Sequence, residues 1–309
     1  MCCAARGVIQ TVAYFFIFKI LNMYLSNYKA LCFALSILFV FSACRKEDDV
    51  PEPAEPQEFG TFDLVFDNVY GDGELSLVGT DDENFDYVNG NNQDFNITLL
   101  GYYITKIELT GPNGEYYADE MATSADPDEV KGFYHVLESD ANSRTIRLNE
   151  VPAGKYDRVN FTIGVDADAV SEGATGGVLD PAEGGWLWNW DAGYIGFAFE
   201  GRSPASPAEA TQWAPENAVQ LHIGGWKDLP DNPSMVNNVK RNSIPFPSSV
   251  SVGERLEPNA HIEMNLLTMI AGPHATVDFS TTFSVHAPAL GSEIAKNLAT
   301  AFTVDHVHQ

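Results

Sequence analysis

Residues 95–109 read FNITLLGYYITKIEL, and the pairs Asn113-Gly114 and Tyr116-Tyr117 follow them. The stretch is rich in β-branched and aromatic residues, which suit a pleated, half-buried surface. Asparagine and glycine tolerate the positive φ angles that a tight hairpin turn needs. The pattern therefore predicts a long strand that leads into a β-hairpin.

Short apolar runs with turn residues between them recur along the rest of the chain. They are rich in Val, Ile, Phe, Tyr and Thr, a composition typical of strands. The predicted strands are residues 61–66, 95–109, 132–137, 145–148, 156–165, 194–199, 219–223, 244–252, 261–267 and 276–285. We therefore expect residues 59–309 to form one all-β domain, a β-sandwich.

One short helix is predicted near the C-terminus, at residues 292–301. Ser292 is placed to cap it, and Ile294, Leu298 and Phe302 fall on one face, as in an amphipathic helix that packs on a core. Long loops are expected at residues 170–185 and 201–217, and loops of that length are often functional.

The N-terminus has the pattern of a secretory leader rather than of a folded segment. An apolar run at residues 31–41 follows Lys29 and ends in Ser42-Ala43-Cys44. The run is too short to cross a bilayer, which needs about 20 apolar residues. It resembles a bacterial lipobox, in which the cysteine thiol is acylated. We predict a signal peptide at residues 1–43, with Met23 as an alternative start, and lipidation of Cys44.

Residues 45–56 form a charged, proline-rich tether, which is expected to be extended and semi-rigid. The lysine and acidic residues after Cys44 resemble the surface-export signal of some Gram-negative lipoproteins, and a solvated spacer is the alternative. The predicted location is therefore the cell envelope, as an outer-membrane lipoprotein, with periplasmic and surface-facing orientations both open.

Charge and cysteine content exclude several classes of function. The chain has 17 basic and 43 acidic residues. The predicted leader contains three of the basic residues, which leaves 14 and a net charge of −29. Such a surface repels nucleic acid and attracts cations. Every cysteine lies at or before Cys44, so the domain has neither disulfides nor thiolate metal ligands.

Three tryptophans, Trp186, Trp188 and Trp190, stand at alternate positions and precede His222. Alternate residues of an extended segment share one face. Tryptophans in such positions usually pack in a core, and beside a histidine they can surround a metal ion.

Short motifs follow one another over about residues 59–308: Tyr102-Tyr103-Ile104, residues 151–156 (VPAGKY), 164–166 (GVD), 188–194 (WNWDAGY), 200–201 (EG), 222–225 (HIGG) and 294–297 (IAKN). These motifs, in this order, resemble the MbnP-like family, periplasmic or surface proteins related to copper-binding partners in methane-oxidising bacteria. The resemblance implies copper binding outside the cytoplasm, beside a tryptophan that is oxidised to kynurenine. Trp188 and Trp190 match the family's tryptophan pair, and a haem peroxidase-type partner would oxidise one of them.

The predicted metal ligands are His222, His306 and His308. His222 matches the family's histidine before Ile-Gly-Gly, whereas His306 and His308 are spaced to share one face of an extended tail. Neutral imidazole suits copper and zinc. We expect these ligands to converge near Trp188 and Trp190, both largely buried, with Trp186 the most exposed. The alternative is that each histidine is only hydrogen-bonded.

A calcium site is considered at Asp166 and Asp168 with Glu172, against the alternative of a turn with solvated carboxylates. No hydrolase, dinucleotide or metalloprotease motif occurs, so no enzymatic activity is predicted. The second candidate function is glycan binding at the cell surface, because exposed tryptophans stack on sugars.

Overall fold

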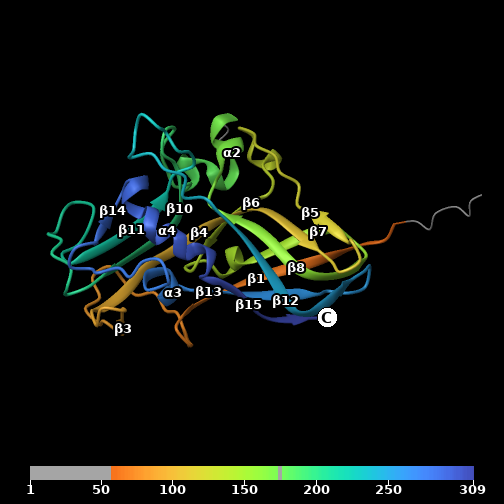
Figure 1. Ribbon diagram of the computed structural model, residues 1–309, viewed down its shortest axis with the longest axis horizontal. Coiled ribbons are helices and arrows are strands. Elements are labelled where there is room, and N and C mark those ends of the chain that lie inside the picture. Colours follow the sequence, from red (N-terminus) through yellow and green to blue (C-terminus); the bar gives the residue numbers. More distant parts are fainter. Residues whose placement is uncertain (1–56, 173–175) are drawn as a thin grey trace, which may run out of the picture. The chain divides into compact units, whose positions relative to one another are not determined.

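The computed structural model describes residues 57–172 and 176–309, apart from the side chain of Glu172. Cys44, the predicted leader and the tether up to residue 56 lie outside the described residues. Two β-sheets enclose the main hydrophobic core (Figure 1), which confirms the predicted β-sandwich.

The smaller sheet has five strands. Its order is β15 (Phe302–His308), β13 (Asn259–Asn265), β1 (Phe59–Tyr70) and β2 (Gly73–Glu74), and β7 (Thr145–Pro152) also pairs with β1. Strands β1 and β13 run parallel, and the other pairs are antiparallel. Phe62, Leu64 and Phe66 of β1 are fully buried while the residues between them are partly exposed, as a period of two requires.

The larger sheet has ten strands. Its main path is β12 (Lys240–Val252), β8 (Gly154–Ile163), β4 (Asp94–Thr110), β10 (Gly193–Arg202), β11 (Ala218–Gly224) and β14 (Ser284–Val285). Four short strands flank β4 and β10: β3 (Tyr87–Val88), β5 (Tyr116–Ala118), β6 (Phe133–Leu137) and β9 (Leu187–Asn189). The predicted hairpin is confirmed, because β4 pairs with β5 across Asn113 and Gly114, whose φ is 95°.

The predicted strand at residues 276–285 is wrong except for its last two residues. Val277 and Phe279 are buried, but side chains satisfy their backbone groups: Asn89 Nδ2 donates to the Val277 carbonyl, and the Phe279 amide donates to Gln93 Oε1. Because these groups already have partners, the segment needs no neighbouring strand.

The C-terminal helix is shorter than predicted. Helix α4 (Ser292–Ala295) passes into a 3₁₀ turn (Lys296–Ala299), and Ile294, Leu298 and Phe302 are buried as expected. Ser292 does not cap the helix, since its hydroxyl donates to the Ala289 carbonyl.

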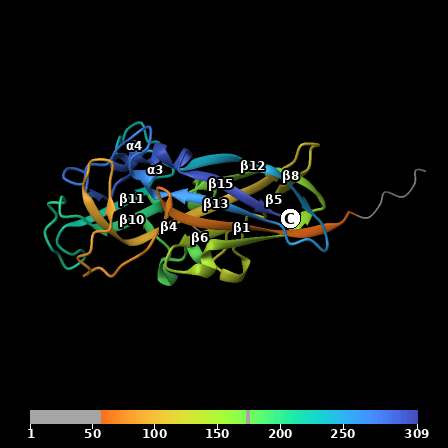
Figure 2. The same ribbon diagram turned by 90° about the horizontal axis from the view of Figure 1, so that it is seen from below.

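Two further helices were not predicted: α2 (Ala167–Glu172) and α3 (Leu266–Ile270). Figure 2 shows α3 and α4 at the same end of the sandwich. The remaining 3₁₀ turns are Pro127–Glu129, Ala141–Arg144, Gly177–Leu179, Pro181–Glu183 and Pro288–Gly291. Within the described residues, no helix has the length and apolar character needed to cross a membrane.

Candidate metal centres

His222 lies on the outer face of β11. Val219, Leu221 and Ile223 of this strand belong to the core, so His222 points to the opposite face. Its Nε2 lies 2.7 Å from Glu200 Oε1 of the neighbouring strand β10. The hydrogen bond to His222 is the main cause that lowers the pKa of Glu200. Because an ionised carboxylate only accepts, Nε2 donates, and Nδ1 of neutral His222 is left with a free lone pair.

His286 is brought beside His222 by the short strand β14. Leu221 pairs in parallel with Val285, so the next residues of the two strands become neighbours. The two imidazole ring centroids are 4.6 Å apart and the rings are nearly perpendicular. Partial burial, followed by the charge of His222, lowers the pKa of His286, which favours the neutral imidazole that binds metals.

Trp188 covers the same face of β11. A Cβ atom added to Gly224 would lie 2.5 Å from the Tyr194 carbonyl oxygen and 2.9 Å from Cζ3 of Trp188, so the glycine lets both the backbone of β10 and the indole approach. Gly224 and His222 are two residues apart, which places them on one face roughly 7 Å apart along the strand. Trp188 thus packs on the face of β11 that carries His222, but its side chain is half-buried rather than largely buried as predicted.

The predictions for the other two tryptophans are wrong. Trp190 is 48% exposed, because Asn189 Oδ1 accepts hydrogen bonds from the amides of Asp191 and Ala192 and holds Trp190 in the β9–β10 turn. Trp186 is half-buried rather than the most exposed of the three, with its ring 4.3 Å from that of His135.

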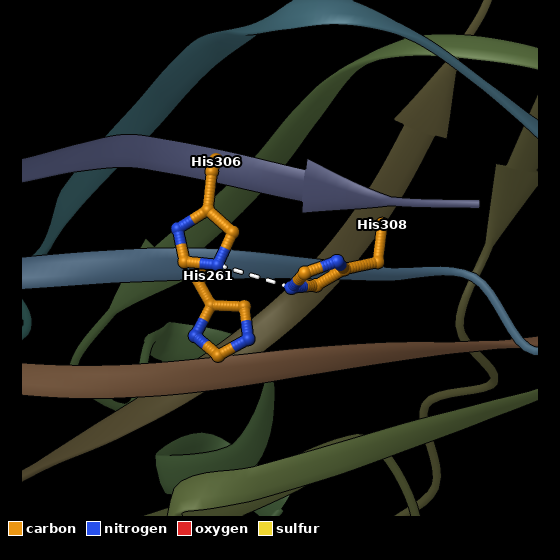
Figure 3. A group of neighbouring side chains, drawn as sticks. All are labelled: His261, His306 and His308. Carbon is orange, nitrogen blue, oxygen red and sulfur yellow. Dashed lines mark hydrogen bonds between the residues drawn. The ribbon is translucent and has the colours of Figure 1, made fainter.

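His306 and His308 lie on β15, and a third histidine, His261, lies beside them on the neighbouring strand β13 (Figure 3). The rings of His261 and His306 are stacked with centroids 4.2 Å apart. Nε2 of His306 lies 3.1 Å from Nε2 of His308. His261 has no motif around it, and its only signal is an outward position in a predicted strand, which does not identify its neighbours.

The predicted single site is therefore divided. His222 belongs to the ten-stranded sheet with Glu200 and His286, whereas His306 and His308 belong to the five-stranded sheet with His261. The ligand atoms of this histidine triad (His261, His306 and His308) all lie within 4.8 Å of one another. Across residues 57–172 and 176–309, no other group of three or more His, Cys, Asp or Glu side chains is gathered this closely.

Asp166 and Asp168, the candidate calcium ligands, already pair with the ammonium group of Lys106. Lys106 Nζ contacts Asp166 and lies 2.7 Å from Asp168 Oδ2. The side chain of Glu172 lies outside the described residues. An ammonium group between the two aspartates supplies the positive charge that calcium was expected to provide, so the geometry favours the structural alternative.

The fold and these clusters define the class as an all-β sandwich with histidine clusters on the outer faces of both sheets. A family model described as MbnP matches residues 59–287. The chain thus belongs to the MbnP family. The matched segment contains Trp188, His222 and His286 and ends before His306.

The chain is also similar to a solved structure, MbnP from Methylosinus trichosporium. Sequence identity is 15% and the TM-score is 0.42, over 71% of this chain and 79% of that one. No curated protein matches the chain.

Proposed function

We propose that this protein binds copper outside the cytoplasm and relays it, with His222 and His286 as ligands beside Trp188. One observation carries the proposal. His222, held by Glu200, has the ring of His286 4.6 Å away and shares its face of β11 with Trp188.

Glu200 acts as a positioning residue in this proposal. A carboxylate that accepts the N–H of a ligating histidine orients the ring and fixes its tautomer. The hydrogen bond from Nε2 directs Nδ1 of His222 to the metal, and His286 supplies the second nitrogen. Two neutral imidazoles suit copper, and residues 57–309 contain no cysteine that would compete for it.

Trp188 supplies a third contact in this proposal. The family resemblance implies that a haem peroxidase-type partner converts a tryptophan to kynurenine, whose amine and carbonyl are better donors than an indole. Trp188 packs over Gly224, on the face of β11 that carries His222, and its half-buried side chain leaves part of the indole open to such a partner. Trp190 is exposed at the turn and is the less suitable of the pair.

Lipid anchoring completes the proposal. Acylation at Cys44 would attach the chain to the envelope, and the charged tether at residues 45–56 would separate the domain from the membrane. The acidic surface would raise the local concentration of cations. The protein itself would carry out no turnover chemistry.

Copper binding to the full-length protein and its variants tests the proposal. We expect His222→Ala and His286→Ala to weaken copper binding at this site at least tenfold, measured by competition with a chromogenic chelator. His274→Ala is the matched control, because His274 is exposed and its side chain makes no hydrogen bond, ion pair or ring contact with the described residues. Unchanged stoichiometry and affinity in His222→Ala would contradict the proposal.

The glycan alternative requires several indoles on one open surface. Of the three clustered tryptophans, only Trp190 is exposed, while Trp186 packs on His135 and Trp188 on Gly224. The geometry therefore favours metal binding over a sugar platform at this place.

A further inference from the structure

We propose that the histidine triad is a second metal site, which takes a borderline divalent ion such as Zn²⁺ or Cu²⁺ and is separate from the site at His222. Imidazole nitrogens suit these ions. The three rings come from two adjacent strands and face one another (Figure 3).

The spacing of the nitrogens fits one ion. Two nitrogens bound at about 2.0–2.1 Å to a tetrahedral zinc lie roughly 3.3 Å apart. The Nε2 atoms of His306 and His308 are 3.1 Å apart, and all three ligand atoms lie within 4.8 Å of one another. Small ring rotations would close the set, and three protein ligands leave the fourth position to water.

Two carboxylates already orient two of the rings. Nδ1 of His261 lies 2.7 Å from Asp67 Oδ2, and Nδ1 of His306 lies 2.7 Å from Asp305 Oδ2. A carboxylate at Nδ1 holds the proton there and directs the lone pair of Nε2 outward. This is the arrangement found around ligating histidines, in which the second ring nitrogen donates to a carboxylate.

A register shift in β15 builds the cluster. His261 pairs with His306 and Ile262 with Val304, so Asp305 has no partner on β13. Such an extra residue changes the direction of the side chains that follow it. Val304 and Val307 pack against the core, whereas His306 and His308 both point outward beside His261. Regular pairing would have turned His306 toward the core.

Only His261 of the triad lies in the segment that matches the family. His306 and His308 lie beyond residue 287, where the match ends, and they belong to the other sheet from His222. The complete second site therefore requires two ligands from outside the matched segment. Since its ligands join β13 to β15, metal bound here would also hold the C-terminal strand in place.

Metal stoichiometry of the full-length protein tests this inference, with Zn²⁺ alone and Cu²⁺ alone as probes. We expect the double variant His306→Ala/His308→Ala to bind one Cu²⁺ fewer than the wild type and to lose the rise in melting temperature that Zn²⁺ causes. The His222→Ala variant should keep that rise. His274→Ala is the control, and the melting temperature without metal checks folding.

The outcomes separate the two proposals. If the double variant keeps the wild-type stoichiometry and the zinc-induced rise, the second site does not exist. If copper is lost only in His222→Ala, the proposed function stands and this inference fails. If copper is lost only in the double variant, this inference stands and the proposed function fails. Should the double variant fold poorly, His308→Gln provides the same test, because the side chain of His308 is exposed.

Discussion

The Nε2 atoms of His306 and His308 lie 3.1 Å apart on the outer face of β15. Two imidazoles at this distance either share a proton or hold a cation. The stacked ring of His261 adds a third nitrogen, and the carboxylates of Asp67 and Asp305 orient the cluster.

Asp305→Ala should weaken zinc binding at the triad by about 10–100-fold, the usual effect of removing a carboxylate behind a ligating histidine. The reason is that His306 loses the acceptor that fixes its tautomer and orientation. Isothermal titration with Zn²⁺ measures the change. Asp305→Glu should restore part of the affinity, and the exposed Asp128→Ala serves as a control. Wild-type affinity in Asp305→Ala would show that the carboxylate has no such role.

Gly224→Ala should displace Trp188. The new methyl group would lie 2.5 Å from the Tyr194 carbonyl oxygen and 2.9 Å from the indole, so both the neighbouring strand and the ring must move. We expect a loss of about 1–3 kcal/mol in the free energy of unfolding, as for overpacked sites, and weaker copper binding. Tryptophan fluorescence and chemical denaturation measure both effects. Gly73→Ala, where the nearest atom is 3.7 Å away, should change neither.

His135 should make the protein less stable in acid. Burial lowers its pKa from 6.5 to about 4, and its Nε2 has no hydrogen-bond partner among the described residues. In the unfolded chain this histidine takes up a proton as the pH falls through 6.5, while in the folded chain it stays neutral down to about pH 4. Its contribution is therefore fully present above pH 6.5 and decreases between pH 6.5 and 4, by at most about 1.4 kcal/mol per pH unit.

The variant His135→Phe isolates this contribution. Phenylalanine keeps a ring against Tyr103 and Trp186 but cannot be protonated. Urea unfolding at a series of pH values should show a shallower decline below pH 6.5 than in the wild type. Identical slopes in the two proteins would mean that other groups cause the decline.

Calcium should have no effect on the stability of the domain. Lys106 already lies between Asp166 and Asp168, so these carboxylates have a cation without any added metal. The melting temperature should be the same with millimolar calcium and with a calcium chelator. In Lys106→Met the aspartates lose their partner, and only there would a calcium-dependent rise be expected.

Cys44→Ser should release the protein from the envelope or leave its precursor uncleaved, because the hydroxyl cannot replace the thiol that is acylated. Fractionation of cells that produce the full-length chain, followed by intact mass, measures both the anchor and the loss of residues 1–43. A soluble, unacylated wild-type protein that keeps its leader would be incompatible with the predicted lipoprotein.

Local patterns account for most of the fold. Apolar residues alternate with more polar ones in β1 and in part of β4, and this period of two can be recognised from residues that are adjacent in the sequence. The Asn113-Gly114 turn and the buried face of Ile294, Leu298 and Phe302 are equally local. The family motif grouped Trp188 with His222, and Trp188 packs over Gly224, two residues from His222 on the same face of β11.

Which strands pair, and in which register, was decided by the packing of the whole chain. His261 lies beside His306 because β13 pairs with the edge strand β15. The register shift at Asp305 turns the side chains of His306 and His308 outward. Neither feature has a local signal, since any outward strand residue is equally suited to many partners. Trp190, by contrast, is exposed for a local reason, because Asn189 accepts hydrogen bonds from the amides of Asp191 and Ala192 in the turn. Periodicity is a property of adjacent residues, whereas a site made from two strands depends on long-range hydrogen bonding that only the folded sheets determine.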